Sequence, residues 1–341
     1  MRFLSIAALA LVGAVMTGCS SEDNFTAQPQ QQVADKGNVV TVTATVGLGE
    51  QAGTRKLTID GSKGVKTFAV GDKIAVVYQN TSGTMVKAET AALIATDITS
   101  GGKSAKITVT MTDPKAGGTL KYIYPAAMAG ATDVDYTKLN SQDGSLDNLG
   151  KKFDLAVYDG NLTSEAKLPA SATLENKLSI LAVTLKNSGS SDITSTITGM
   201  TLGDGTNTYS VTREAAAGPI YVAIQPTTSA SISITATDGS KNYAKSLTGK
   251  DYAANNGYSV SWTVKQQYSI TITGPYSGAK LKMEFCEGDT WNDMAAKYPT
   301  YLSIHSTTKW VMFYTDGFIY GNEKKVLSTE QVDPNATYTI S

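Results

Sequence analysis

The stretch from Val39 to Val46 alternates strictly between apolar and polar residues. One face of an extended chain would carry Val40, Val42, Ala44 and Val46, and the other face Thr41, Thr43 and Thr45. This period of two indicates a strand with one buried and one exposed face. Comparable short strands recur behind turn signals as far as residue 264, without amphipathic helices between them. The pattern predicts an all-β fold of antiparallel sandwich type.

Turn-rich segments suggest how the chain is divided. A loop-rich region before residue 152 contains Ser141-Gln142-Asp143-Gly144, a strong turn signal. We therefore expect one β-sandwich over 39–150, a second over 151–265, and a small α+β module over 266–341. In this last module, Asp289–Tyr298 is predicted to be a short helix, with Thr290 and Asp293 forming a capping box.

The first 38 residues predict export. Arg2 precedes an apolar run, Phe3–Val15, which is too short for a permanent membrane span and is typical of a removable signal peptide over residues 1–18. Met16-Thr17-Gly18-Cys19 resembles the lipobox of bacterial lipoproteins, which implies acylation of Cys19. Two or three acyl chains, at about 0.8 kcal/mol per buried CH₂, would hold the chain to a membrane. Residues 19–38 are predicted to form a flexible tether, because they are polar and rich in Gln.

Composition argues against several classes of function. The formal net charge is −1 and like charges form no long block, so nucleic-acid binding is not expected. Because His305 is the only histidine, neither a histidine metal cluster nor a histidine-based triad is expected. The sequence also has no P-loop, dinucleotide-binding or zinc-protease motif, and we expect no cofactor and no enzymatic activity. With Cys19 acylated, Cys286 has no intramolecular disulfide partner.

Further motifs follow the lipobox, the tether and the alternating strand in a definite order. They are Gly53-Thr54-Arg55, Leu57-Thr58-Ile59-Asp60, Phe68–Val76, Ser141–Leu146 and Leu174–Ile180. Over residues 1–265 this order resembles the fimbrillin family, the type V pilins and pilin-like lipoproteins of the Bacteroidetes. The resemblance implies transthyretin-like sandwiches, a lipid anchor in the outer membrane and export to the cell surface.

The resemblance also implies a mode of assembly. In that family an arginine-specific protease removes the first strand, and a donor strand from another subunit fills the groove. Arg55 is the candidate processing site, because it lies in the Gly-rich loop directly after the first strand. Beyond the signal peptide Arg213 is the only other arginine, and it lies near another predicted loop. The alternative for Arg55 is a solvent-exposed loop charge, since anchor-type members keep the first strand.

The C-terminal module departs from a shaft subunit, which ends in its donor strand. The leading hypothesis is therefore an accessory or tip subunit of a fimbrium, with other fimbrial subunits and a host or bacterial surface ligand as partners in adhesion. The alternative is a non-polymerising surface lipoprotein that binds a glycan or a protein. Its platform would be the aromatic residues of the tail, which could instead form a small hydrophobic core: Trp291, Trp310, Phe313, Tyr314, Phe318 and Tyr320. A third hypothesis, a glycoside hydrolase with paired carboxylates, has no such pair located in the sequence.

Overall fold

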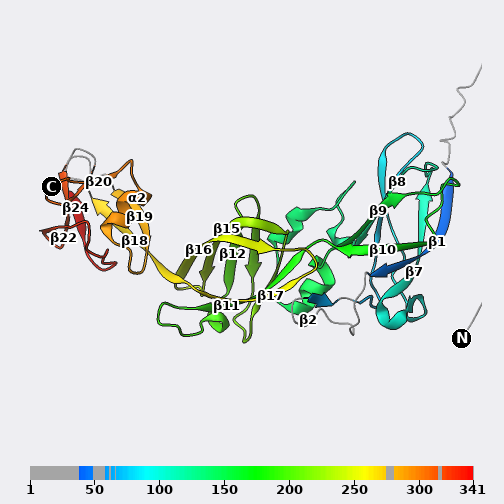
Figure 1. Ribbon diagram of the computed structural model, residues 1–341, viewed down its shortest axis with the longest axis horizontal. Helices are drawn as coiled ribbons and strands as arrows, with labels where there is room; N and C mark the ends of the chain where they lie inside the picture. The colour runs from blue at the N-terminus through cyan, green and yellow to red at the C-terminus, as the bar shows by residue number, and fades with distance from the viewer. Residues whose placement is uncertain are drawn as a thin grey trace, which may run out of the picture. The chain divides into compact units, whose positions relative to one another are not determined.

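Strands make up most of the part of the chain that the structure describes, which comprises residues 38–48, 58–60, 63–65, 67–273, 280–313 and 317–340. Figure 1 shows this computed structural model as a chain of β-strands with few and short helices. The prediction of an all-β fold class is confirmed.

The first sheet has eight strands in the order β5-β4-β8-β9-β10-β1-β7-β6. Its members are β1 (Val39–Leu48), β4 (Ala75–Gln79), β5 (Met85–Glu89), β6 (Ile98–Thr99), β7 (Ser104–Thr112), β8 (Thr119–Tyr124), β9 (Ala156–Asn161) and β10 (Ser171–Asn176). The strand predicted for Val39–Val46 is confirmed as β1. A separate hairpin joins β2 (Thr58–Asp60) to β3 (Lys63–Val65).

Strand β4 is buried on both faces. Ala75 and Val77 lie in one apolar core, which continues through residues 126–155 and the strands beyond residue 178. Val76 and Tyr78 lie in a second core, formed with β1, β7, β8 and β10. A strand with two buried faces needs a continuous apolar run, which is why Ala75–Tyr78 does not alternate.

Two further sheets hold the rest of the strands. A three-stranded sheet has the order β14-β11-β17, from β11 (Ser179–Lys186), β14 (Ile220–Ile224) and β17 (Gly257–Thr263). An eleven-stranded sheet contains β12 (Gly199–Gly203), β13 (Thr208–Thr212), β15 (Thr227–Thr237), β16 (Asn242–Tyr252), β18 (Lys265–Thr273), β19 (Lys280–Cys286), β20 (Leu302–Ile304), β21 (Val311–Phe313), β22 (Gly317–Gly321), β23 (Lys324–Lys325) and β24 (Tyr338–Ile340).

Helices are short. Among the described residues the α-helices are α1 (Leu146–Asn148) and α2 (Trp291–Lys297). The described chain also has the 3₁₀ turns η1 (Ala95–Asp97), η2 (Ser100–Gly102), η3 (Ala126–Met128), η4 (Tyr136–Asn140) and η6 (Thr194–Thr196) and the π turn η5 (Leu149–Phe153). The predicted capping box of α2 is confirmed. Asp293 N donates to Thr290 Oγ1 at 3.3 Å, and the Asp293 carboxylate accepts from Thr290 N at 2.8 Å.

The sheets are mixed, so the expectation of purely antiparallel pairing is wrong. The β1–β10, β11–β17 and β18–β24 pairs are parallel, whereas the other pairs between named strands are antiparallel among the described residues. In each parallel pair the partners are far apart in the sequence, and a long connection lets the chain return in the same direction. Alternation within one strand carries no information about these distant partners.

Strands β9 and β10 lie beyond the predicted boundary at residue 150 and yet belong to the first sheet. β9 pairs with β8 and β10 in that sheet, and β10 also pairs with β1. The predicted boundary near 266 falls inside β18, whose first residues pair with β16 and whose remainder pairs with β19. Residues from Asn38 onward cluster as one compact unit, so the division at 150 and 265 stays a prediction.

Candidate assembly site at the first strand

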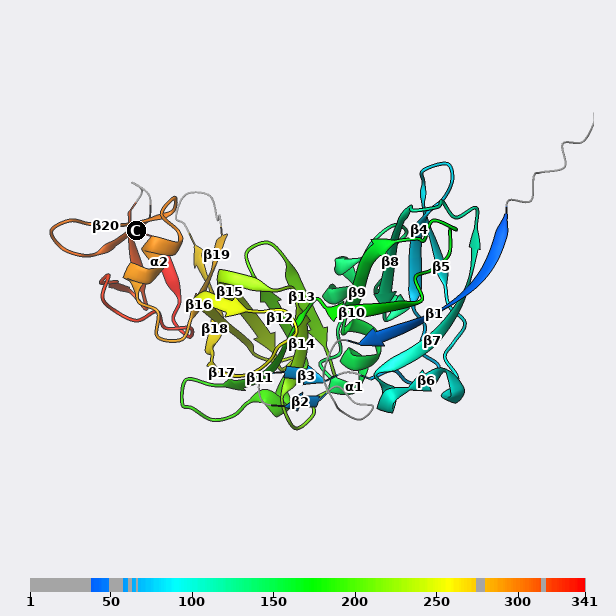
Figure 2. The same ribbon diagram turned by 45° about the vertical axis from the view of Figure 1, so that its right-hand side comes forward.

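Strand β1 lies in the interior of a sheet and has a partner on each side. Val39–Gly47 pairs with β7 in antiparallel register, from Val39 opposite Thr112 to Gly47 opposite Ser104. The last four residues, Thr45–Leu48, pair in parallel with Ser171–Leu174 of β10. Figure 2 shows β1 running alongside β7, with β10 meeting its C-terminal end. Taking β1 away would therefore leave unpaired backbone groups on two strands.

The inward face of β1 packs into an apolar core, as the alternation predicted. Val42, Ala44 and Val46 are 8%, 4% and 0% exposed, and Val40 is half-buried against the same core. Leu48 adds a further buried position. Ile107, Val109 and Met111 of the neighbouring strand β7 belong to the same core, together with residues of β4, β8 and β10. Loss of β1 would thus expose apolar surface along a strip the length of the strand.

The outward face of β1 carries threonines in register with threonines of β7. The hydroxyl oxygens of Thr41 and Thr110 lie 3.2 Å apart, and those of Thr43 and Thr108 lie 3.4 Å apart, all on exposed side chains. These cross-strand pairs fix the register of β1 against β7 by matching polar positions at the surface.

Two predicted site residues lie outside the described residues, namely Cys19 and Arg55. Lipidation and processing therefore stay predictions. The strand that processing would remove, marked by Val40, Val42, Ala44 and Val46, is β1 of the eight-stranded sheet, and its displacement stays a prediction.

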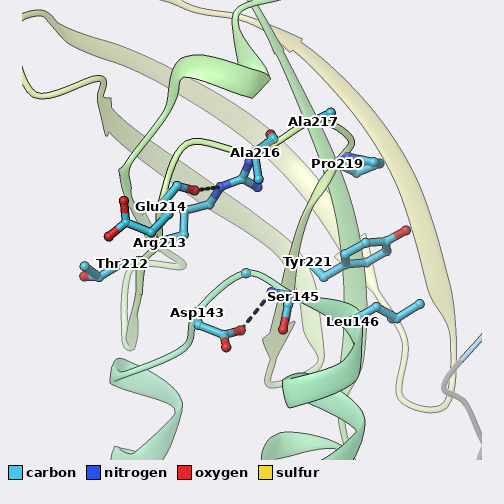
Figure 3. Close-up of a pocket in the computed structure, with 11 residues that line it drawn as sticks. Asp143, Ser145, Leu146, Thr212, Arg213, Glu214, Ala216, Ala217, Pro219 and Tyr221 are labelled. Carbon is cyan, nitrogen blue, oxygen red and sulfur yellow. Dashed lines mark hydrogen bonds between the residues drawn. The ribbon is translucent and has the colours of Figure 1, made fainter.

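Arg213 follows β13 and lines a pocket of about 660 Å³ (Figure 3). Its Nε donates to the carbonyl of Glu214 at 3.2 Å, and its Nη2 donates to the carbonyl of Ala216. Burial lowers the pKa of the Arg213 guanidinium from its usual value. The side chain is half-buried and braces its own loop, so this arginine has a structural role in the folded chain.

The Ser141–Leu146 motif joins the edges of two sheets. Gln142 N donates to Ser210 O, and Thr212 N donates to Gln142 O, so residue 142 extends the edge of β13. Tyr221 N donates to Gly144 O, which places Gly144 at the edge of β14. Gly144 has φ +72°, and a Cβ there would lie 2.9 Å from Val211 Cγ1, so only glycine fits. The turn signal was visible in the sequence, whereas this joining role was not.

The C-terminal aromatics divide into two groups. Trp291 is fully buried in the core of the C-terminal module, as the core interpretation predicted. Trp310 and Phe318 are half-buried, and Lys325 Nζ lies 4.1 Å and 4.2 Å from their ring centroids. The ammonium group of Lys325 therefore covers one face of each ring. Tyr314 lies outside the described residues.

Strand β24 ends the described chain between two partners. Ile272 and Thr273 of β18 pair with it on one side, and Ile319–Gly321 of β22 pair with it on the other. Tyr338 and Ile340 are 3% and 7% exposed. Donating β24 to another molecule would require breaking both pairings and uncovering both side chains.

Other candidate chemistry is sparse in the part of the chain that the structure covers. Within it, three or more His, Cys, Asp and Glu side chains do not gather into a metal-binding group. None of its helices combines the length and apolar character needed to cross a membrane. Cys286 is a free, half-buried thiol in β19, and burial raises the pKa of that thiol.

Comparison with known proteins gives structural matches only. No family model and no curated protein sequence matches the chain. A fimbrial assembly protein from Parabacteroides distasonis is similar over 67% of this chain and 95% of its own, with 7% identity and a TM-score of 0.37. A putative cell adhesion protein from Bacteroides fragilis is similar over 72% of this chain and 97% of its own, with 13% identity and a TM-score of 0.34.

A fimbrial protein from Bacteroides ovatus matches 60% of this chain and 48% of its own length, with 12% identity and a TM-score of 0.26. Structural matches to fimbrial and putative cell adhesion proteins of the Bacteroidetes thus extend over most of the chain, as the resemblance to the fimbrillin family led us to expect.

Proposed function

We propose that this chain is a lipid-anchored fimbrial subunit at the cell surface, which accepts a donated strand in place of β1 and serves adhesion. The observation that carries the proposal is the position of β1, a separate amphipathic strand held between β7 and β10. A groove left by β1 would offer unpaired backbone groups together with an apolar floor. An incoming strand with the same alternation satisfies both.

The sequence between β1 and β2 contains Arg55, where a cut would free β1. One cut after Arg55 would disconnect β1 from β2, which begins at Thr58. Arg213, the competing arginine, is held by carbonyl groups of its own loop and is a poorer substrate for a protease that must draw the guanidinium into its own pocket. Accessible loops are preferred sites of proteolysis, and the sequence predicts such a loop directly after the first strand.

An accessory or tip position suits the engaged state of β24. A shaft subunit must accept a strand and donate one, whereas donating β24 would break the pairings on both of its edges.

The proposal also includes two β-sandwiches of transthyretin-like architecture. It includes a lipid anchor at Cys19, because an acylated cysteine followed by a tether would leave the folded part outside the outer membrane.

Strand uptake by the full-length protein tests the proposal. The protein is digested with an arginine-specific protease and mixed with a fluorescent synthetic peptide of residues 39–48. Cut protein should take up the peptide into complexes that survive electrophoresis in detergent, whereas uncut protein and Arg55→Ala should not. A matched peptide with Val42→Asp and Val46→Asp should fail to bind, because it places charges in the core.

Two results would contradict strand acceptance. Uptake by uncut protein equal to uptake by cut protein would mean that β1 is not the occupant being replaced. A cut protein that stays folded and excludes the peptide would indicate an anchor or a non-polymerising binding protein that keeps its first strand.

A further inference from the structure

A polar pocket of about 420 Å³ is lined by four lysines, and none of its lining residues belongs to β1. The lysines come from four separate segments: Lys73 precedes β4, Lys87 lies in β5, Lys138 lies in η4 and Lys151 lies in η5. We call this the lysine pocket. Four lysines around one pocket place positive charge locally on a chain whose formal net charge is −1.

The residues that line the lysine pocket carry fewer negative charges than positive charges. Its lining includes two carboxylates, Asp72 and Glu89. Asp72 accepts from Ala69 N at 2.7 Å and from the Tyr124 hydroxyl, so its hydrogen-bonding capacity is engaged by groups other than lysines. The carboxylate of Glu89 forms ion pairs with two lysines, at 3.9 Å from Lys73 Nζ and 3.8 Å from Lys87 Nζ.

These ion pairs leave the lysines available to a ligand. The side chains of Lys73 and Glu89 are 51% and 42% exposed, and pairs at such distances and exposure are weak. Lys151 pairs with Asp147 at 2.6 Å, where both side chains are exposed by more than half. An anion with several oxygens could therefore recruit these ammonium groups at little cost.

Lys138 provides a fixed point in the pocket wall. Its Nζ donates to Ala127 O at 2.6 Å and to Ala129 O at 2.8 Å, which uses two of its three protons and orients the third. The same ammonium group lies 4.0 Å from Asp135. A cation held by backbone carbonyls loses little conformational freedom on binding, which favours a preformed anion site.

We propose that the lysine pocket binds a sulfated or phosphorylated sugar. Tetrahedral oxyanions present several acceptors to several ammonium groups at once. A single oxyanion fills only part of 420 Å³, which lies within the usual range of small-ligand sites, so the charged group is carried on a larger polar body. This site is separate from the groove of β1, and binding does not depend on strand exchange.

Fluorescence anisotropy with uncut full-length protein and a labelled heparin tetrasaccharide tests the proposal. Binding should weaken as NaCl rises from about 0.05 M to about 0.5 M, because salt screens exposed charges. Glucose 6-sulfate and glucose 6-phosphate should each compete, and their ranking distinguishes sulfate from phosphate as the preferred group. Unsubstituted glucose should not compete.

Charge variants locate the site. Lys73→Gln combined with Lys87→Gln should weaken binding about tenfold, since each lost ammonium removes a charge-assisted hydrogen bond. Glu89→Gln should tighten binding, because it removes the carboxylate that competes with the anion. The control is Lys241→Gln combined with Lys282→Gln, two exposed lysines outside the pocket, which changes the net charge equally and should leave the affinity unchanged.

Equal weakening by the control pair would assign the binding to overall charge and overturn the proposal. An affinity of Glu89→Gln at or below that of the wild type would also overturn it. Melting curves of every variant should coincide with that of the wild type. This control shows that a loss of affinity is not caused by unfolding of the variant.

Discussion

The side-chain amide of Gln142 makes two hydrogen bonds with the backbone of Ala223, in the way that a neighbouring strand would. Its Nε2 donates to Ala223 O at 2.9 Å, and its Oε1 accepts from Ala223 N at 2.8 Å. The residue is 3% exposed, and Nε2 also donates to Leu139 O at 2.9 Å. A segment from the loop-rich region before β9 is thereby fastened to the edge of β14.

Gln142→Leu should destabilise the protein by about 2–4 kcal/mol, because it leaves buried backbone groups of Ala223 without partners. Chemical unfolding followed by tryptophan fluorescence measures the change. Gln331→Leu, at an exposed position, is the matched control and should change the free energy of unfolding by less than about 0.5 kcal/mol. Equal effects of the two substitutions would show that the paired amide contributes nothing specific.

Val42→Asp should lower the free energy of unfolding of the uncut protein by at least about 3 kcal/mol, since it buries an unpaired charge beneath β1. Thr43→Asp, at the neighbouring exposed position, should have a small effect. Thermal melting compares the two. A melting temperature unchanged by Val42→Asp would mean that β1 does not pack as described.

Cys19→Ala should abolish labelling by palmitate and release the protein from the membrane fraction, because the acyl chains are the proposed anchor. Fractionation and acyl labelling of whole cells measure both effects. Ser20→Ala is the control and should stay membrane-bound. A Cys19→Ala protein that remained labelled would contradict the lipobox interpretation.

Arginine-specific digestion of the folded protein should cut after Arg55 and spare Arg213, whose guanidinium is bound to the carbonyls of its own loop. Mass spectrometry of the fragments identifies the sites. In urea both arginines should be cut, which controls for the intrinsic susceptibility of each bond. Early cleavage at Arg213 in native buffer would show that its loop opens readily.

The lowered pKa of Asp238 predicts that part of the free energy of unfolding is lost in acid. Burial opposes its charge, but hydrogen bonds from Lys241 N, Ser240 N and the Tyr243 hydroxyl outweigh this and lower its pKa from 3.8 to about 2. A carboxyl whose pKa is lower in the folded state stabilises above pH 3.8, and this contribution is lost as pH falls through about 2. Asp238→Asn should therefore melt below the wild type at pH 6, with the difference shrinking between those two values. A constant difference across that range would exclude the linkage.

Local patterns predicted the parts of this fold that depend on local chemistry. The alternation of Val42, Ala44 and Val46 specified a strand and its buried face, and Thr290 with Asp293 specified the start of α2. The parallel pairing of β1 with β10 and the bonding of Gln142 to β14 were missed, because each depends on residues far away in the sequence. The same holds for the lysine pocket, whose four lysines are unremarkable until the fold brings them together.

The two halves of β1 differ in how many neighbouring strands they pair with, so they should separate from the sheet in a fixed order. Val39–Ala44 is bound by β7 alone, whereas Thr45–Gly47 has neighbours on both edges among the described strands. Fraying should start at Val39, which is 60% exposed, so amide hydrogens of the first residues should exchange with solvent before those near Val46. The single-edged half is thus a toehold, where an invading segment could begin to displace β1 and advance one residue at a time.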